Sequence, residues 1–418
     1  MKDIQKARSD LLKIYQAAVN AVGGRRAVNA HLQETPLEGD WSLVAIGKAA
    51  QSMAQGAEDA LGEQLQDGLV ITKQGHLDAQ WIKTSRFSGV ESSHPVPDQR
   101  SLDAGHQLVE YLESLPPERR LLFLISGGTS SLVERLNAGV GFEELVRLND
   151  WLLGSGLSIT SVNRIRKRIS HIKGGGLLGY LGKRKVVGLL ISDVPGDDPS
   201  IIGSGLLVHD EQKARIDANL PEWAQPLLAS GSETEIAPEA DVSLAIVANL
   251  RTAREAAAEK AGALGYETKV NHAFISADAA NSGRRLALEM LDALPGVYIW
   301  GGEPTVMLPE NPGRGGRNQH LALSAARVIE GTKDTCFLSC GTDGTDGPGE
   351  DAGAVVDGGT LGRARKEGFD AEDCLARADS GSLLEASGDL VSTGPTGTNV
   401  MDLMIGLKFE ESSDDAFY

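Results

Sequence analysis

The stretch LLFLISGGTS, residues 121–130, decides the fold, because five apolar residues run directly into a loop of serine, glycine and threonine. The same order of apolar run, glycine-rich loop and helical stretch recurs along the chain. It is found at residues 43–50, 68–76 and 186–198, and the pattern resumes after a break at 244–263, 297–305 and 335–348. Short apolar runs bounded by such loops and alternating with helices are typical of βα units. They predict a largely parallel sheet.

The chain is long enough, at 418 residues, for two domains. Residues 211–238 are polar and contain prolines, so they indicate a boundary between the two halves of the pattern. We expect an N-terminal α/β domain over 1–235 with a Rossmann-like, largely parallel sheet. A C-terminal α/β domain is expected over 240–418, and its final segment could pack back on the first. Ligands of open parallel sheets bind outside the carboxyl ends of the strands, which favours a cleft between the domains.

The net charge and the number of cysteines argue against several classes of protein. A formal net charge of −18 argues against a nucleic-acid partner, which needs a basic face. Three cysteines form no even disulfide framework and indicate a reducing compartment. No secretory signal opens the chain, and no apolar run approaches the roughly 18 residues of a membrane span. We therefore expect a cytoplasmic protein that is not associated with a membrane and acts on small molecules.

The first candidate site is the loop Ser126, Gly127, Gly128, Thr129 and Ser130. Consecutive backbone N–H groups at the start of a helix bind anions, and glycine removes the side chain that would block a phosphate. The alternative is an ordinary tight turn between a strand and a helix. The loop alone leaves both interpretations open.

Acidic loops follow two other apolar runs. Asp193, Asp197 and Asp198 lie within six residues of each other, and their like charges repel unless a cation shares them. We expect Asp193 to be a Mg²⁺ ligand and Asp198 to cap the helix that follows, whereas a solvated turn is the alternative. Asp343, in the loop 341–347, could hold a metal or orient a substrate hydroxyl.

A glycine-rich loop at 313–320 carries two arginines before an apolar helical segment. The guanidinium fork suits a carboxylate or a phosphate, and Gly315 and Gly316 let the backbone close around the anion. We expect Arg317, whose backbone the helix start fixes, and Asn318 to bind substrate or nucleotide. Arg314 lies where the chain is expected to be most flexible, and a solvated basic turn remains the alternative for the whole loop.

Three further cations are candidates. Lys48 directly follows a strand and Gly47, where a point charge suits a phosphate or carboxylate. The basic run 163–168 has a helical spacing that favours a solvated face, but we expect one of Arg166 or Lys173 to reach the binding cleft.

Neither of two common nucleotide-binding motifs applies to this chain. The chain contains no Gly-x4-Gly-Lys-Ser/Thr and is therefore not a P-loop enzyme. A Gly-x-Gly-x-x-Gly occurs at Gly174, Gly176 and Gly179, but a basic stretch rather than an apolar strand precedes it. The segment after it is also too short for a crossover helix, so the match lacks the context of a dinucleotide site.

Eight motifs together resemble the type II glycerate kinase family, in order and over nearly the whole chain. They are AIGKAA (45–50), SHPVPD (93–98), SGGTS (126–130), SDVPGDD (192–198), GGEPT (301–305), GRGGRN (313–318), GTDGTDGP (341–348) and GPTGTN (394–399). The resemblance implies two α/β domains, dependence on ATP and Mg²⁺, and conversion of D-glycerate to 2-phosphoglycerate. Lys48 matches the family's essential lysine and Arg317 its cleft arginine, while Glu303 falls among its binding positions.

Some positions differ from the family pattern, and related sequences carry a second functional name. Positions 129, 131, 176, 206, 320 and 401 differ from the family pattern, which bears on the exact sugar acid rather than on the reaction class. Related sequences are also labelled hydroxypyruvate reductases, so an NAD(P)H-dependent reductase is the alternative function. A regulator that binds sugar phosphates without catalysis would need a DNA-binding module, and the sequence offers no signal for one.

The expected chemistry is phosphoryl transfer by positioning and charge stabilisation. The backbone of 126–130 would cradle phosphates while Asp193 holds Mg²⁺. Lys48 and Arg317 would hold the substrate carboxylate or neutralise the transferring group. Either Asp193 or Asp343 would accept the hydroxyl proton.

Overall fold

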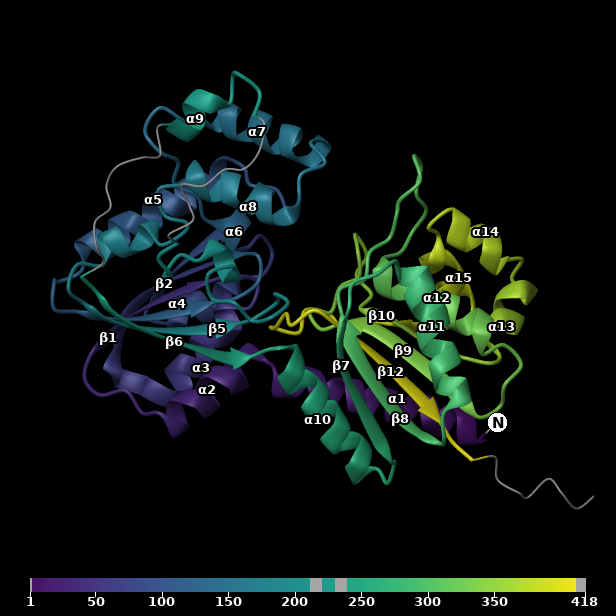
Figure 1. Cartoon of the computed structure of the whole chain (residues 1–418). Coiled ribbons are helices and arrows are strands. Elements are labelled where there is room, and N and C mark those ends of the chain that lie inside the picture. Colours follow the sequence, from purple (N-terminus) through teal and green to yellow (C-terminus); the bar gives the residue numbers. More distant parts are fainter. Residues whose placement is uncertain (1, 211–219, 230–238, 411–418) are drawn as a thin grey trace, which may run out of the picture. The chain divides into compact units, whose positions relative to one another are not determined.

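The computed structural model describes residues 2–210, 220–229 and 239–410 (Figure 1). Its contacts divide the chain into two compact units, and each is built on a six-stranded sheet. The first unit is Gly24–Val247, and the second combines Met1–Gly23 with Ala248–Tyr418. Residues 211–219 and 230–238 of the predicted boundary segment lie outside the described residues. No helix in the described part of the chain is long and apolar enough to cross a membrane.

The first 23 residues belong to the second unit, which differs from the predicted domain 1–235. Helix α1 (Lys2–Ala21) has the amphipathic pattern that the sequence predicts, and it packs against the second sheet. Tyr15 on its buried side donates a hydrogen bond to the carbonyl of Gly341 at 2.6 Å. Arg8 forms ion pairs with two buried carboxylates of the same unit, Asp357 at 2.6 Å and Asp389 at 2.7 Å. Amphipathicity predicts the helix but does not say which sheet covers it.

The sheet of the first unit has the strand order β3-β2-β1-β4-β5-β6. This is the order of a Rossmann fold. Its strands are β1 (Trp41–Ile46), β2 (Leu65–Lys73), β3 (Phe87–Ser92), β4 (Arg120–Ile125), β5 (Lys185–Ile191) and β6 (Asp241–Ala248). Every pair among β1 to β5 is parallel. The predicted Rossmann-like parallel sheet is confirmed.

Helices of the first unit cover this sheet and form an additional layer. They are α2 (Gly24–Glu34), α3 (Ala50–Leu61), α4 (Ala79–Thr84), α5 (Gln99–Ser114), α6 (Thr129–Leu132), α7 (Phe142–Gly154), α8 (Ile159–Arg168) and α9 (Gln225–Ala229), with short 3-10 turns at Gly62–Gln64 (η1), Gly176–Tyr180 (η2) and Ile202–Ser204 (η3). Helices α7, α8 and α9 lie together (Figure 1) and share an apolar cluster that includes Leu145, Leu148, Ile165 and Leu227. This helical layer forms one wall of the cavity described below.

The sheet of the second unit has the order β11-β10-β9-β12-β8-β7 and is mostly antiparallel. Its strands are β7 (Thr268–Ile275), β8 (Gly296–Gly302), β9 (Thr335–Gly341), β10 (Gly353–Asp357), β11 (Leu390–Val391) and β12 (Asp402–Lys408). Among the described strands of this second sheet, only β7 and β8 pair in parallel. Strand β12 runs antiparallel between β8 and β9. The expectation that the parallel pattern resumes in this half is therefore wrong.

Seven helices of the described chain pack in the second unit. Besides α1 they are α10 (Leu250–Ala263), α11 (Ala279–Asp292), α12 (Arg317–Val328), α13 (Thr360–Lys366), α14 (Ala371–Ala376) and α15 (Ser380–Ala386). Helix α12 packs against α11, β9 and β10, and nearly all of its residues are buried. The three cysteines, Cys336, Cys340 and Cys374, are buried and form no disulfide.

Candidate functional site

The loops after β1 and β4 meet where the strand order of the first sheet reverses. Lys48 donates its backbone N–H to the carbonyl of Gly127 at 2.9 Å, and Ser126 donates its own to Ile46 at 3.0 Å. The hydroxyl of Ser126 accepts a hydrogen bond from the N–H of Ala49 at 3.1 Å. A doubly wound sheet binds its ligand at this reversal point. The structure therefore brings Lys48 and the loop 126–130 together, as their positions after strands predict.

Two glycines allow this close approach. Gly47 has φ +130°, and a Cβ there would lie 2.1 Å from the Ser126 hydroxyl oxygen. Gly128 has φ +88°, and a Cβ there would lie 2.9 Å from Cδ2 of His94 and 3.3 Å from Cγ of Lys48. The side chains of His94 and Lys48 thus converge over Gly128. Any larger residue at this position would push them away.

The loop 126–130 presents four consecutive amide donors. In the described part of the chain, the backbone N–H groups of Gly127, Gly128, Thr129 and Ser130 make no hydrogen bond. The Thr129 hydroxyl serves the turn itself, because it donates to the carbonyls of Ile46 at 2.9 Å and Ser126 at 2.7 Å. Helix α6, which follows, has only four residues, so the anion site expected at a helix start would depend on these loop amides and not on a helix dipole.

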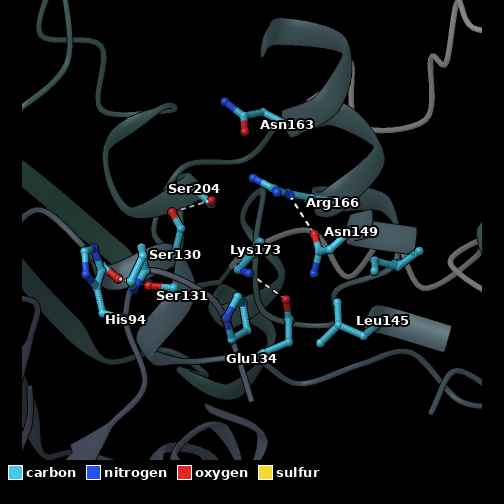
Figure 2. Close-up of a pocket in the computed structure, with 14 residues that line it drawn as sticks. His94, Ser130, Ser131, Glu134, Leu145, Asn149, Asn163, Arg166, Lys173 and Ser204 are labelled. Carbon is cyan, nitrogen blue, oxygen red and sulfur yellow. Dashed lines mark hydrogen bonds and ion pairs between the residues drawn. The ribbon is translucent and has the colours of Figure 1, made fainter. Parts of the chain in front are cut away.

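A cavity of about 220 Å³ lies next to this loop in the first unit (Figure 2). Its lining includes Gly128, Ser130 and His94 from the loops, and both Arg166 and Lys173. Both Arg166 and Lys173 thus reach this cavity, and the expectation that one of them binds a ligand stays a prediction.

The surroundings of the two cations differ. Lys173 forms an ion pair with Glu134 at 2.5 Å, and the two side chains are only 4% and 2% exposed. Arg166 donates its Nε–H to Oδ1 of Asn149 at 3.0 Å. Burial lowers the pKa of the Arg166 guanidinium.

The rest of the basic run 163–168 is not solvated as expected. Lys167 is buried and donates to Asp210 at 2.7 Å and to the carbonyl of Ser200 at 3.0 Å. Arg168 donates to the carbonyl of Leu228 at 3.0 Å. Helix α8 packs inside the helical layer, so these side chains find partners within the unit.

The acidic loop after β5 has a partly different structure from the one predicted. Asp198 accepts a hydrogen bond from the N–H of Ser200 at 2.8 Å, so it caps a turn before the 3-10 helix η3 and not an α-helix. Asp193 lies two residues after the end of β5 and is half-buried. Among the described residues no three His, Cys, Asp or Glu side chains form a metal-binding group. The metal roles of Asp193 and Asp343 stay predictions.

Arg317 begins α12 in the second unit, where it is bound to two carboxylates. Its Nε and Nη2 donate to the carboxylate of Asp402 at 2.6 and 3.2 Å, and its Nη1 donates to Glu303 at 2.7 Å. Asp402, the first residue of β12, is 1% exposed. Burial raises the pKa of Asp402 to about 6, although Arg317 opposes this. The fork expected to bind a substrate anion therefore holds an internal carboxylate, Asp402, which sequence reasoning missed as a site residue.

The glycines beside Arg317 shape the start of α12. Asp346 accepts the N–H of Asn318 at 3.0 Å and the N–H of Gln319 at 2.8 Å, so it caps the helix from another loop. A Cβ on Gly316 would lie 2.4 Å from this carboxylate, and Gly315 has φ +134°. The Asn318 side chain accepts from the Ser339 hydroxyl at 2.7 Å. These residues have clear structural roles, and their ligand-binding roles stay predictions.

Asp343 and Arg314 are both held within the second unit. One carboxylate oxygen of Asp343 accepts from the N–H and the hydroxyl of Thr345, both at 3.0 Å. The guanidinium of Arg314 forms ion pairs with Glu385 and Asp351. Arg314 is therefore anchored to surface acids and does not lie in a loose loop as expected.

Comparison with known proteins gives family matches over both halves of the chain. The sequence model of a domain of unknown function, DUF4147, matches residues 10–220, and that of the MOFRL family matches residues 296–402. D-Glycerate 2-kinase of Thermotoga maritima is 36% identical over 97% of this chain and 100% of its own. Glycerate 2-kinase of Pyrococcus horikoshii is 33% identical, covering 94% of this chain and 93% of its own. A putative hydroxypyruvate reductase of Agrobacterium vitis is 37% identical, covering 95% and 93%.

A solved structure also shows similarity to a glycerate kinase. The crystal structure of glycerate kinase from Thermotoga maritima matches this fold with a TM-score of 0.86 at 35% identity. The match covers 97% of this chain and 100% of that one.

Proposed function

The chain belongs to the glycerate kinase family, and from this premise we propose that it is a glycerate 2-kinase that transfers the γ-phosphoryl group of ATP to the 2-hydroxyl of D-glycerate, with Mg²⁺ as the metal. The observation that carries the proposal is the loop at the reversal point of the first sheet. Lys48 and His94 converge there over Gly128, beside four consecutive amide donors. Phosphoryl transfer depends on positioning and on stabilising negative charge, and this loop supplies both cation and donors.

The chain's own residues account for the handling of phosphate. The amides of 127–130 are proposed to hold phosphate oxygens, since glycine leaves the backbone accessible. Lys48 is proposed to neutralise charge that develops on the transferring group. Asp193 and Asp343 offer carboxylate oxygens of the kind that Mg²⁺ prefers, and either is a candidate to accept the proton of the hydroxyl. A bound Mg²⁺ would supply charge neutralisation for the phosphates.

Arg317 is proposed to act through Asp402. Its bidentate contact fixes a carboxylate that burial would otherwise protonate. The Nη1 contact is to Glu303, which is 44% exposed and can exchange for another anion. We therefore propose that the main role of Arg317 is to position Asp402. A ligand would contact Arg317 only through Nη1.

The reductase alternative has two observations in its favour, namely the name of the Agrobacterium vitis relative and the Rossmann order of the first sheet. A dinucleotide site needs its glycine fingerprint in the first βα turn. Here the turn after β1 carries Lys48, and the Gly-x-Gly-x-x-Gly of 174–179 follows helix α8 rather than a strand. These positions favour the kinase.

The direct test compares two reactions of the purified protein. ADP formation from ATP, Mg²⁺ and D-glycerate is measured, and ³¹P NMR identifies which hydroxyl is phosphorylated. NADH oxidation by hydroxypyruvate is measured beside it. We expect 2-phosphoglycerate and no comparable oxidation of NADH. Efficient NADH oxidation without ADP formation would replace the kinase by the reductase.

A further inference from the structure

The cavity in the first unit carries an unbalanced positive charge. Its charged lining consists of Glu134, Arg166 and Lys173. Glu134 and Lys173 form a buried pair at 2.5 Å, so their charges cancel. One positive charge remains, on Arg166, in a chain whose formal net charge is −18.

Arg166 has hydrogen-bond donors that the described part of the chain does not use. Its Nε–H is held by Asn149 at 3.0 Å, and Figure 2 shows this contact at the cavity. Within the described residues, its two terminal nitrogens have no hydrogen-bond or ion-pair partner. Burying a cation without a counter-ion is costly, and burial already lowers the pKa of this guanidinium. An anion in the cavity would remove that cost.

The neutral part of the lining suits a hydroxylated ligand. Ser130, Ser204 and Asn163 present hydroxyl and amide groups, and the two serine hydroxyls lie 2.7 Å apart. Ser204 has φ +60°, in the left-handed region that residues other than glycine rarely adopt. Such strained conformations cluster where a side chain must be aimed at a ligand.

The size of the cavity favours a small acid over a nucleotide. Its volume of about 220 Å³ is below the roughly 300–1,000 Å³ typical of pockets for drug-sized ligands. No phenylalanine, tyrosine or tryptophan occurs among its lining residues to stack on a base. A single positive charge also matches one carboxylate better than a polyphosphate.

We propose that this cavity is the subsite for the sugar acid, in which the two terminal nitrogens of Arg166 bind the substrate carboxylate and Ser130, Ser204 and Asn163 hydrogen-bond its hydroxyl groups. Asn149 is a positioning residue that fixes the plane of the guanidinium. The assignment rests on the proposed kinase function. Gly128 and His94, which the kinase proposal places beside the phosphate, line the same cavity as Arg166.

The test replaces Arg166 by glutamine and separates the two substrates. Loss of a charged bidentate contact should raise KM for D-glycerate by at least about thirtyfold, whereas KM for ATP should stay within about twofold. Calorimetry gives a readout that needs no turnover: wild type should bind D-glycerate but not its neutral amide, and Arg166→Gln should bind neither. Arg147→Gln is the matched control, because within the described residues Arg147 contacts only the Trp223 ring and lies outside the lining.

The outcomes separate this assignment from the kinase proposal. A rise in KM for ATP with unchanged binding of D-glycerate would make the cavity a nucleotide phosphate site and overturn the proposal. Unchanged values for both substrates would also overturn it. Binding of D-glycerate that is lost in Arg166→Gln, in a protein with no kinase activity, would support the subsite and refute the kinase. If Arg166→Gln does not fold, Arg166→Lys serves instead, with an expected loss of at least about tenfold because an ammonium cannot bind in a fork.

Discussion

Arg317 and Arg314 lie three residues apart in one glycine-rich loop, and replacing each by lysine should have very different effects. Lysine keeps the charge and loses the fork. At Arg317 it can retain only one of the two contacts to Asp402, which are 2.6 and 3.2 Å long. A hydrogen bond to a buried charged group contributes about 1.5–3 kcal/mol. The additional contact to Glu303, which is 44% exposed, contributes at most about 1 kcal/mol. We expect Arg317→Lys to lower the free energy of unfolding by about 2 kcal/mol.

Arg314 is 46% exposed and pairs with Glu385, which is 61% exposed, so Arg314→Lys should cost less than about 1 kcal/mol. Hydrogen exchange measured by mass spectrometry on peptides from α12 and β12 locates the effect, because only loss of the Asp402 contact loosens both elements. In steady-state kinetics, Arg317→Lys should lower kcat/KM by at least about a hundredfold, and Arg314→Lys should stay within roughly tenfold of wild type. Equal losses, or a larger loss at Arg314, would refute this division of roles.

Four further outcomes are expected. Lys48→Ala should lower kcat/KM by at least about a hundredfold with little change in Tm, and near-normal kinetics would remove Lys48 from the site. Removal of divalent cations by EDTA should abolish turnover and Mg²⁺ should restore it, whereas undiminished turnover would exclude the metal. Gly316→Ala would place a Cβ 2.4 Å from the carboxylate of Asp346 and should lower the free energy of unfolding by about 1–3 kcal/mol; Gly362→Ala, which lies inside α13 and meets nothing within 4 Å, should raise it by up to about 1 kcal/mol in the same urea titration. Because folding raises the pKa of Asp402 from 3.8 to about 6, the folded state binds its proton more tightly, so the free energy of unfolding should fall as pH rises through this interval; burial also raises the pKa of Asp346, to about 7, so Asp402→Asn should reduce that slope without abolishing it, and an unchanged slope would mean that Asp402 does not titrate in this interval.

The carboxyl ends of three strands of the first sheet could be predicted from the sequence to the residue. The apolar runs that end at Ile46, Ile125 and Ile191 are strands β1, β4 and β5, which end at these same positions. Each run is bounded by a glycine or serine loop, and that boundary is a local signal. Because consecutive parallel strands place their carboxyl ends on one edge, the meeting of Lys48 with the loop 126–130 follows from the same signal.

Long-range pairing could not be predicted in this way. Helix α1 has the same amphipathic pattern whichever sheet it covers, and its Arg8 forms an ion pair with Asp357, 349 positions along the chain. The basic run around Lys167 looks solvated in sequence because its partner, Asp210, lies on a distant segment. The pairing of Lys173 with Glu134 has the same origin. A periodic pattern specifies which side of a helix is apolar, but not which carboxylate will face its charged residues.

Asp402 could not be predicted as a site residue, although the neighbouring position 401 differs from the family pattern. Position 401 is a methionine whose backbone has φ +70°, a region that residues other than glycine, asparagine and aspartate rarely adopt. Its carbonyl accepts hydrogen bonds from the N–H of Thr342 at 3.0 Å and from the Thr342 hydroxyl at 2.6 Å. The loop after β9 therefore holds position 401 through its backbone, and the buried methionine side chain leaves that contact intact. Since this turn delivers Asp402 to the start of β12 and to Arg317, a departure at 401 changes the side chain of the turn without removing the carboxylate that the turn positions.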